Sequence, residues 1–304
     1  MRGLTRALVV GGAGFFGGRL VEELEARGVE TTVLDQRGGD LVVDATEVDL
    51  TAAIDGRGVD AVFQLAGTGL VPTSLAEPLG DLWRNAGTTL AALEGARFAR
   101  RPPVVAYVSS AAVYGEGREM PMREDHPLEP VSPYGISKLA AERYVALYAQ
   151  LYGVPAFSVR PFSLYGPGQR KLVVYDLLVR LLGGEDPLVV GGAAEVSRDF
   201  VFVADAARSL AALARSAPAR GEAYNFASGR RTTLGELVSS LLAATGLAPE
   251  VRFTGTVRPG DPVRWDGDAS LARTLGAAFD TTLEDGLRLT VEWLVGSRQR
   301  DAVA

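Results

Sequence analysis

The chain has 304 residues, 47% of them hydrophobic and 22% charged, which is enough for about two domains with a sizeable core. A net charge of −6 without any basic block argues against a nucleic-acid partner or a membrane-surface partner. The absence of cysteine excludes disulfides, iron–sulfur clusters, thiolate nucleophiles and cysteine-rich zinc sites, and a single histidine, His126, excludes sites that need two imidazoles. We therefore expect no bound metal.

No uncharged apolar run reaches the ~18–20 residues of a membrane span. The apolar stretch 7–18 is too rich in glycine for a secretory signal, and a strand followed by a loop explains it better. We therefore expect a cytoplasmic protein.

The first half of the chain alternates apolar strands with helical segments, which predicts a parallel sheet covered by helices on both faces. The predicted strands are Arg6–Val10, Glu30–Asp35, Leu41–Asp44, Ala61–Ala66, Val104–Ser110 and Ala156–Arg160. The predicted helices are Phe15–Arg27, Leu79–Phe98 and a longer one from near Tyr134 to Gly153.

After Pro161 the pattern becomes less regular. We expect the sheet to receive one more strand and helix near Asp199–Ala214, while a smaller domain forms from the rest. The predicted limits are residues 1–162 for the sheet domain, with a return segment near 199–227, and residues 163–198 and 228–304 for the smaller domain.

A glycine-rich loop joins the first predicted strand to the first predicted helix. Gly11, Gly12, Gly14 and Gly17 satisfy both Gly-x-Gly-x-x-Gly and Gly-x-x-Gly-x-x-Gly. Missing Cβ atoms let a backbone turn sharply and approach a pyrophosphate, and the helix N-terminus supplies free N–H groups. An isolated motif of this kind indicates only a tight turn, but its place between strand and helix indicates a dinucleotide site.

An acidic residue follows the glycine loop at the distance that a dinucleotide site requires. Asp35 closes the second predicted strand, where a carboxylate can accept hydrogen bonds from ribose hydroxyls. A carboxylate there repels the 2′-phosphate of NADP, so we expect NAD as the cofactor. Arg37 could partly offset that repulsion, and an ordinary strand-end turn is the alternative for Asp35.

Tyr134 and Lys138 form a Tyr-x-x-x-Lys pair at the start of the long predicted helix. Their i, i+4 spacing places both side chains on one helix face. A nearby ammonium favours the phenolate, so we expect Lys138 to lower the pKa of Tyr134 and the pair to act as a general base. The pair occurs by chance in many proteins, and it gains weight here from the glycine loop, Asp35 and Ser110.

Together these motifs resemble the extended short-chain dehydrogenase/reductases, the family of nucleotide-sugar epimerases and dehydratases. The resemblance runs from about Leu8 to Trp293 and includes the segments 108–115, 160–168, 197–203 (with Arg-Asp-Phe) and 258–261, which matches the family's C-terminal nucleotide clamp. It implies an α/β fold: a Rossmann-type doubly wound parallel sheet with a smaller mixed α/β C-terminal substrate domain. It also implies a homodimer through the helix that begins near Tyr134.

The resemblance assigns roles to individual residues. The catalytic residues would be Ser110, Tyr134 and Lys138. The expected cofactor contacts are Gly11, Gly14, Phe15, Phe16, Gly17, Asp35, Asp44, Ala45, Leu65, Ala66, Gly67, Tyr134, Lys138 and Pro161. The expected substrate contacts are Ser110, Tyr134, Ser163, Gln169, Arg198, Arg258, Asp261 and Trp265, with the two arginines as ligands of a diphosphate.

Three positions depart from the family's pattern. Residues 64–67 are Gln-Leu-Ala-Gly where His-Leu-Ala-Ala is usual, which leaves the cofactor contact mainly to backbone, and Ser163 stands where Asn is common. Ala111 and Ala112 follow Ser110, where dehydratases have Asp-Glu and glucuronate decarboxylases have a Glu at the second position. Dehydration and decarboxylation therefore lack their proton-transfer groups, and thiol-dependent 3,5-epimerisation lacks its cysteine.

We therefore predict an NAD-dependent 4-epimerase of a UDP- or dTDP-linked sugar that works through a transient 4-keto sugar. The enzymatic alternative is an NAD(P)H-dependent 4-ketoreductase of a nucleotide-linked deoxysugar, which Asp35 disfavours because such reductases commonly use NADPH. The non-enzymatic alternative is a redox sensor that only binds NAD(H), which the intact triad disfavours.

Two aromatic features allow two interpretations each. Trp265 either packs in the smaller domain or walls the sugar pocket, and the family's pattern implies that its bulk there would favour a 2-hydroxy sugar, such as UDP-glucose, UDP-galactose or a uronate, over a 2-acetamido sugar. The apolar stripe of Tyr144, Leu147, Tyr148 and Leu151 is either core or, as we expect, a dimer face. His126 is expected in a loop.

Overall fold

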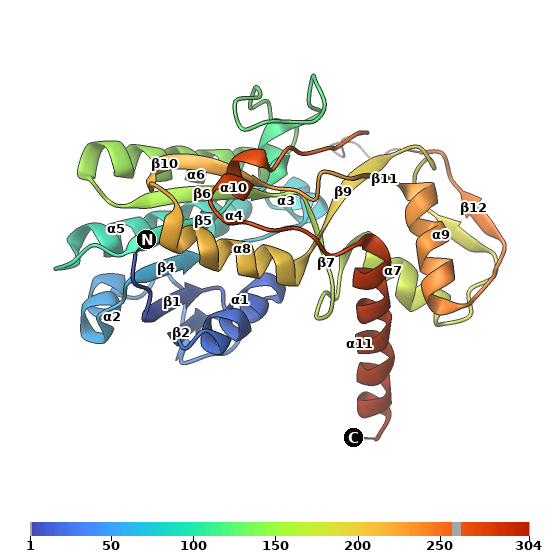
Figure 1. The fold of residues 1–304 in the computed structure, drawn as a ribbon, viewed down its shortest axis with the longest axis horizontal. Coiled ribbons are helices and arrows are strands. Elements are labelled where there is room, and N and C mark those ends of the chain that lie inside the picture. Colours follow the sequence, from blue (N-terminus) through green and yellow to red (C-terminus); the bar gives the residue numbers. More distant parts are fainter. Residues whose placement is uncertain (1, 257–262, 304) are drawn as a thin grey trace.

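The computed structural model of the protein describes residues 2–256 and 263–303. A seven-stranded parallel sheet dominates it, with the strand order β10-β6-β5-β4-β1-β2-β3 (Figure 1). These strands are β1 (Arg6–Val10), β2 (Glu30–Asp35), β3 (Leu41–Val42), β4 (Ala61–Gln64), β5 (Val104–Val108), β6 (Ala156–Pro161) and β10 (Arg220–Phe226). The strand order reverses between β1 and β4, as in a Rossmann-type doubly wound sheet, which confirms the predicted fold class.

Helices cover both faces of this sheet. One face carries α1 (Phe15–Ala26), α8 (Val203–Ser216) and α10 (Ser270–Thr274), and the other carries α2 (Leu50–Arg57), α5 (Thr88–Phe98) and α6 (Pro133–Tyr152). Each face has its own apolar core, with Leu20 and Leu210 buried on the first face and Ile54 and Val145 buried on the second. Burial on both sides explains why β5 is an uninterrupted apolar run.

Two small sheets lie beside the large one (Figure 1). The first has the order β11-β9-β7 and the second pairs β12 with β8. Their strands are β7 (Ser163–Tyr165), β8 (Leu188–Val190), β9 (Ser197–Phe202), β11 (Arg231–Thr233) and β12 (Val251–Phe253), accompanied by α7 (Leu172–Leu181), α9 (Leu234–Thr245) and α11 (Leu283–Val303). A separate apolar cluster, which includes Leu178, Leu241 and Leu294, holds them together. The predicted domain limits stay a prediction.

The expectation that a strand near Asp199 joins the large sheet is wrong. That strand, β9, pairs with β7 and β11 in the three-stranded sheet, and β10 completes the large sheet beside β6. The helix expected there does return to the large sheet, because α8 packs against α1. The local sequence pattern predicts that a strand forms, but it does not predict which strand it pairs with.

The helix predicted at Leu79–Phe98 is interrupted. It consists of α4 (Pro78–Leu82), a π-helical turn (Trp83–Gly87) and α5, and the hydroxyls of Thr88 and Thr89 donate to the carbonyls of Arg84 and Asn85 at 2.8 and 2.7 Å. Such side-chain bonds compete with the regular backbone ladder. The short helices α2 and α3 (Val71–Ala76) were not anticipated, and the third, fourth and fifth predicted strands each end two residues early.

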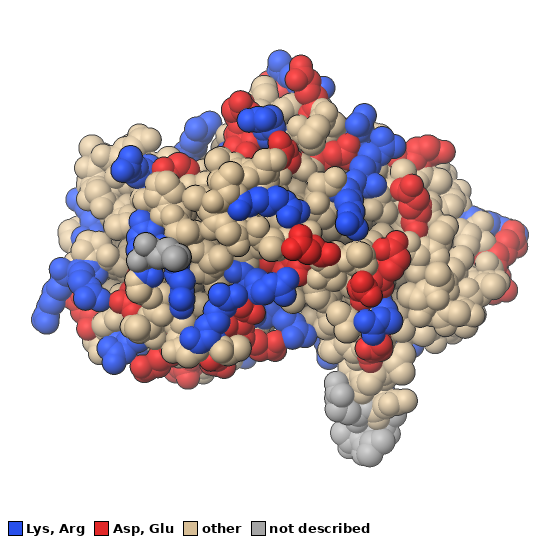
Figure 2. Space-filling view, viewed as in Figure 1, with Lys and Arg blue, Asp and Glu red and all other residues tan. Residues whose placement is uncertain are grey.

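Acidic and basic side chains are interspersed over the face that Figure 2 shows. Over residues 2–256 and 263–303, no helix is both long and apolar enough to cross a membrane.

Candidate active site

A cavity of about 2050 Å³ opens at the carboxyl ends of β1, β2, β4 and β5, where doubly wound sheets bind ligands. Its wall also includes residues of the smaller sheets, such as Arg198 and Phe200 of β9. Every predicted site residue that the structure describes lines this one cavity. The predicted Arg258 and Asp261 lie outside the described residues.

The glycine loop forms a cradle that only glycine permits. Gly11 has φ +86°, and a Cβ there would lie 2.5 Å from the Ala66 nitrogen, while a Cβ on Gly17 would lie 2.2 Å from the Gly11 oxygen. The helix α1 begins after Gly14 without a side-chain cap, so its first N–H groups face the cavity end without an internal acceptor. These residues fit the pyrophosphate of a dinucleotide.

Asp35 is tied to this loop. Its carboxylate accepts hydrogen bonds from the Ala13 N–H at 3.2 Å and from the Arg37 N–H at 3.0 Å, and it is only 8% exposed. The Arg37 guanidinium lies 3.9 Å away and is 81% exposed, so it remains at the rim. At the end of β3, Asp44 accepts from the N–H and hydroxyl of Thr46, and these bonds lower the pKa of Asp44.

At the exit of β4, the family's usual histidine is replaced by Gln64. This side chain is fully buried, donates to the Thr88 hydroxyl at 2.8 Å and does not line the cavity. Leu65, Ala66 and Gly67 line it instead. That these three residues contact the cofactor stays a prediction.

The predicted triad comes from two elements that pack closely. Ser110 caps the 3₁₀ helix Ala111–Tyr114, where its hydroxyl accepts from the Ala112 N–H at 3.1 Å. Tyr134 lies in the first turn of α6, whose start is capped by the Ser132 hydroxyl. The two elements pack this closely because a glycine, Gly135, lies at their contact. A Cβ at this position would lie 2.6 Å from the Ala112 oxygen.

Lys138 is buried one turn further along α6. Its ammonium donates to the Val108 carbonyl at 2.9 Å and stands 6.0 Å from the centre of the Tyr134 ring. Burial lowers the pKa of Lys138 to about 8, and the carboxylate of Asp81 counteracts this effect. This bond uses one of the three N–H donors of the ammonium.

Burial raises the pKa of Tyr134 to about 12, and a hydrogen bond with Ser110 only partly offsets it. The pKa of Tyr134 is therefore raised in this structure, whereas we expected the nearby ammonium of Lys138 to lower it. Removing the phenolate from water costs more free energy than the neighbouring groups return. In the free protein the phenol holds its proton at neutral pH.

The model of the NAD-dependent epimerase/dehydratase family matches residues 7–227 of the chain. The chain belongs to this family. The UDP-glucose 4-epimerase of Mycolicibacterium smegmatis is 31% identical to it, over 97% of this chain and 100% of the relative.

Two solved structures extend the comparison over almost the whole fold. MoeE5 in complex with UDP-glucose and NAD is 32% identical and covers 96% of this chain and 99% of its own, with a TM-score of 0.88. A UDP-N-acetylglucosamine 4-epimerase from Methanobrevibacter ruminantium is 28% identical, covers 97% and 100%, and has a TM-score of 0.89. These findings confirm the resemblance, the NAD cofactor and the prediction of an NAD-dependent epimerase of the nucleotide-sugar family.

In this member of the epimerase/dehydratase family, Trp265 packs against a neighbouring ring and also lines the cavity; that it walls the sugar pocket stays a prediction. The indole packs against Phe162 at a ring distance of 6.0 Å and also lines the cavity. Its N–H donates to the Gly115 carbonyl at 2.9 Å, and the Arg198 guanidinium lies 5.6 Å from the ring centre. The ring is thereby fixed from three sides.

Two further residues singled out in the sequence lie in the wall of the cavity and in a loop. The Gln169 amide donates to the Leu164 carbonyl at 2.9 Å, which shapes the wall beside Ser163. His126 accepts a hydrogen bond from the Arg118 N–H at 2.8 Å in the loop before α6, as expected for a loop residue.

Sequence reasoning missed Thr68, Asp81, Asn85 and Ser137, which form a buried polar network behind the triad. An acidic residue within an amphipathic helix gives no indication that it is buried.

Proposed function

We propose that the protein is a 4-epimerase of a UDP-linked sugar with a free 2-hydroxyl, such as UDP-glucose, UDP-galactose or a UDP-uronate. The observation that carries the proposal is that Ser110, Tyr134 and Lys138 share one cavity with the glycine cradle. The residues that follow Ser110 narrow the reaction further.

Ala111 and Ala112 favour epimerisation over dehydration. Ala111 is fully buried and Ala112 contributes an apolar group to the cavity wall. Among the described lining residues the carboxylates are Asp35, Asp44 and Asp176, which belong to the ends of β2 and β3 and to α7, whereas Ser110 follows β5. Elimination of water from a sugar needs an acid and a base beside the reacting carbons, and no carboxylate follows Ser110 to serve as either.

The residues of the chain handle the proton. Bound NAD would supply a hydride acceptor and a positive charge. The positive charge of bound NAD would favour the phenolate of Tyr134, which holds its proton in the free protein. As a phenolate, the Tyr134 oxygen accepts the proton of the sugar 4-hydroxyl and later returns it, and the Ser110 hydroxyl donates a hydrogen bond to the oxygen that becomes the ketone. Lys138 would hold the nicotinamide ribose. The 4-keto sugar then presents its other face to the same groups, which inverts C4.

The fixed position of Trp265 supports a 2-hydroxy sugar. Its ring is fixed by Gly115, Phe162 and Arg198, so it cannot swing away cheaply to admit a larger group. Steric selection against one small group is worth about 1–3 kcal/mol, which predicts a preference of roughly 10–200-fold rather than an absolute barrier. The alternative is a preference for a 2-acetamido sugar, as in the name of the UDP-N-acetylglucosamine 4-epimerase among the similar structures.

The test is the cofactor content and product spectrum of the purified protein. We expect one retained NAD per chain, and interconversion of UDP-galactose and UDP-glucose, or of UDP-uronates, without added cofactor. UDP-N-acetylgalactosamine should react more slowly, and Tyr134→Phe is the inactive control that retains NAD. A protein that arrives without NAD and oxidises NADPH with a 4-keto deoxysugar would instead be the reductase.

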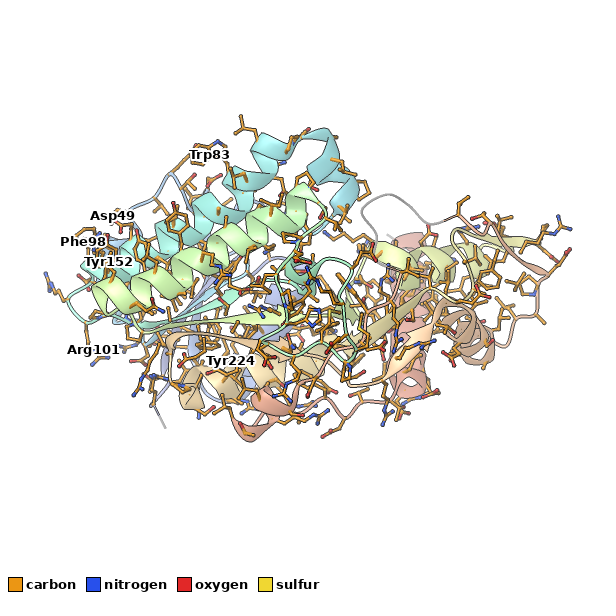
Figure 3. All side chains as sticks on the ribbon, turned by 90° about the horizontal axis from the view of Figure 1, so that it is seen from above. Asp49, Trp83, Phe98, Arg101, Tyr152 and Tyr224 are labelled. Carbon is orange, nitrogen blue, oxygen red and sulfur yellow. The ribbon has the colours of Figure 1, made fainter. Side chains whose placement is uncertain are left out.

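We also propose that the protein forms a homodimer through α6 and its neighbour α5. The predicted stripe divides: Tyr148 is buried, with its hydroxyl bonded to Glu94, while Tyr144, Leu147 and Leu151 are exposed. Trp83, Phe98 and Tyr152 add exposed aromatic surface along the same helical layer (Figure 3). Light scattering on the intact protein, with Leu147→Glu as the disrupting variant, tests this proposal. The cytoplasmic location stays a prediction.

A further inference from the structure

Asp81 of α4 is completely buried within the protein. Its carboxylate accepts a hydrogen bond from the Ser137 hydroxyl of α6 at 2.6 Å and another from the Thr68 hydroxyl in the loop after β4. Within the described chain, no basic side chain lies within salt-bridge distance of it. A buried carboxylate held by two neutral hydroxyls is costly to maintain, so its position calls for a reason.

The hydrogen bonds around Asp81 connect the loop after β4, which lines the cavity, to α6, which carries Tyr134 and Lys138. The Asn85 amide donates to Ser137 at 3.0 Å and to Thr68 at 3.1 Å, and its oxygen accepts from the Thr68 N–H at 3.1 Å. Thr68 follows Gly67 in the cavity wall, and Ser137 precedes Lys138. The Asp81 network (Thr68, Asp81, Asn85 and Ser137) therefore ties the wall at the cofactor side to the helix that bears the base.

The same carboxylate acts through space on the buried ammonium. Lys138 is 4% exposed, and its ammonium faces the Val108 carbonyl and the rings of Tyr107 and Tyr134. Neither ring carries a negative charge at neutral pH, because burial raises the pKa of both phenols. Asp81 is the carboxylate whose field raises the pKa of Lys138 against the effect of burial.

We propose that Asp81 is a positioning residue of the active site, which locks Thr68 to Ser137 and supplies the counter-charge for the Lys138 ammonium. Glu142, further along α6, is engaged by Arg160 in a buried ion pair and so does not compete for this role. Only the assignment of Tyr134 and Lys138 to proton transfer rests on the function proposed above.

The lysine content of the chain permits a direct test. Lys138 and Lys171 are the only lysines in the sequence, so ¹³Cε-lysine labelling gives two side-chain resonances, and Lys171→Arg assigns them. We would titrate Lys138 in the Lys171→Arg background and in that background with Asp81→Asn. Loss of the carboxylate should move the Lys138 titration to lower pH by about one unit.

Two matched variants separate charge from packing. Ser137→Ala removes a bond to Asp81 but leaves its charge, so the Lys138 titration should stay near that of the parent while the retained NAD decreases. Asp205→Asn alters a buried carboxylate of α8 that bonds Thr281, away from the network, and should leave the Lys138 titration unchanged. An unchanged titration in Asp81→Asn would overturn the proposal.

Asp81→Glu keeps the proposal testable if Asp81→Asn does not fold. The glutamate retains the charge but displaces the bonds, so Lys138 should titrate near its original pH and NAD retention should fall. A Lys138 titration that dropped by a full unit in this variant would refute the counter-charge. Because no substrate is needed, failure here would leave the proposed epimerase activity untouched.

Where turnover is measurable, the pH profile provides a second readout. Asp81 raises the pKa of both Lys138 and Tyr134, so Asp81→Asn should displace both limbs of the kcat profile toward lower pH. A residue that only supported the fold would lower kcat without displacing the limbs. Such a result would also count against the proposal.

Discussion

Gly135→Ala would test how closely α6 must approach the Ser110 turn. The added Cβ would lie 2.6 Å from the Ala112 oxygen and 2.8 Å from the Pro130 Cβ, whereas ordinary contact begins near 3.4 Å. One obstacle is a backbone atom and the other belongs to a rigid ring, so neither can give way easily. To bring the 2.6 Å contact to 3.4 Å, the helix has to move outward by about 0.8 Å. Because Tyr134 adjoins this position, the displacement carries the phenol away from Ser110.

Two magnitudes follow from that displacement. A shift of about 1 Å in a catalytic group costs on the order of 10²-fold in rate, so kcat should fall by about that factor. Overpacking a close contact costs about 1–3 kcal/mol, less the ~0.5–1 kcal/mol that alanine gains over glycine in a helix, so Tm should fall modestly.

The assay compares Gly135→Ala with Gly56→Ala. Gly56 lies in α2 with nothing within 4 Å of its hypothetical Cβ, so this control should keep full activity and gain slightly in Tm. We would measure kcat on UDP-galactose, thermal unfolding and retained NAD for both variants. If Gly135→Ala kept the parent kcat, the contact between α6 and the Ser110 turn would not set the catalytic geometry.

Three further predictions concern the site. Tyr134→Phe should lower turnover by at least about 10²-fold while retaining NAD, because only the proton acceptor is lost; near-normal turnover would remove Tyr134 from its role. Asp35→Ala should weaken NAD and relatively improve NADP in a binding titration, since a carboxylate that repels phosphate is gone; an unchanged preference would place Asp35 away from the ribose. Trp265→Ser should raise kcat/KM for the acetamido sugar relative to the hydroxy sugar, and equal values in the unmutated protein would contradict the steric reasoning.

The sequence was informative where chemistry requires local spacing. The glycine loop, Asp35 and the Tyr134–Lys138 pair are each encoded within a few residues, and the structure brings all of them to one cavity. The electrostatics could not be obtained in the same way. The burial that raises the pKa of Tyr134 depends on surrounding elements that are distant in the chain.

Long-range partners were equally hidden. Asp81 and Ser137 are 56 positions apart and meet only because α4 packs on α6. The strand near Asp199 looks like any apolar strand, and its pairing with β7 rather than β6 follows from the path of the chain between the sheets. The π-helical turn before α5 is accompanied by hydrogen bonds from two threonine hydroxyls, and hydrophobic periodicity does not predict the acceptors of such bonds.

The late position of β10 has a consequence for how the protein is made. This edge strand pairs with β6 but follows β7, β8 and β9 in the chain, so the large sheet is incomplete until residue 226 has been synthesised. The Asn225 side-chain oxygen in β10 accepts a hydrogen bond from the Tyr114 hydroxyl, and its amide N–H donates to the Met122 carbonyl, which anchors the loop that follows Ser110. The strands β7, β8 and β9 of the smaller sheets are therefore synthesised before the strand that closes the large sheet, and β11 and β12, which complete the smaller sheets, are synthesised after it. No single cut would release the glycine-loop half as an independent folding unit.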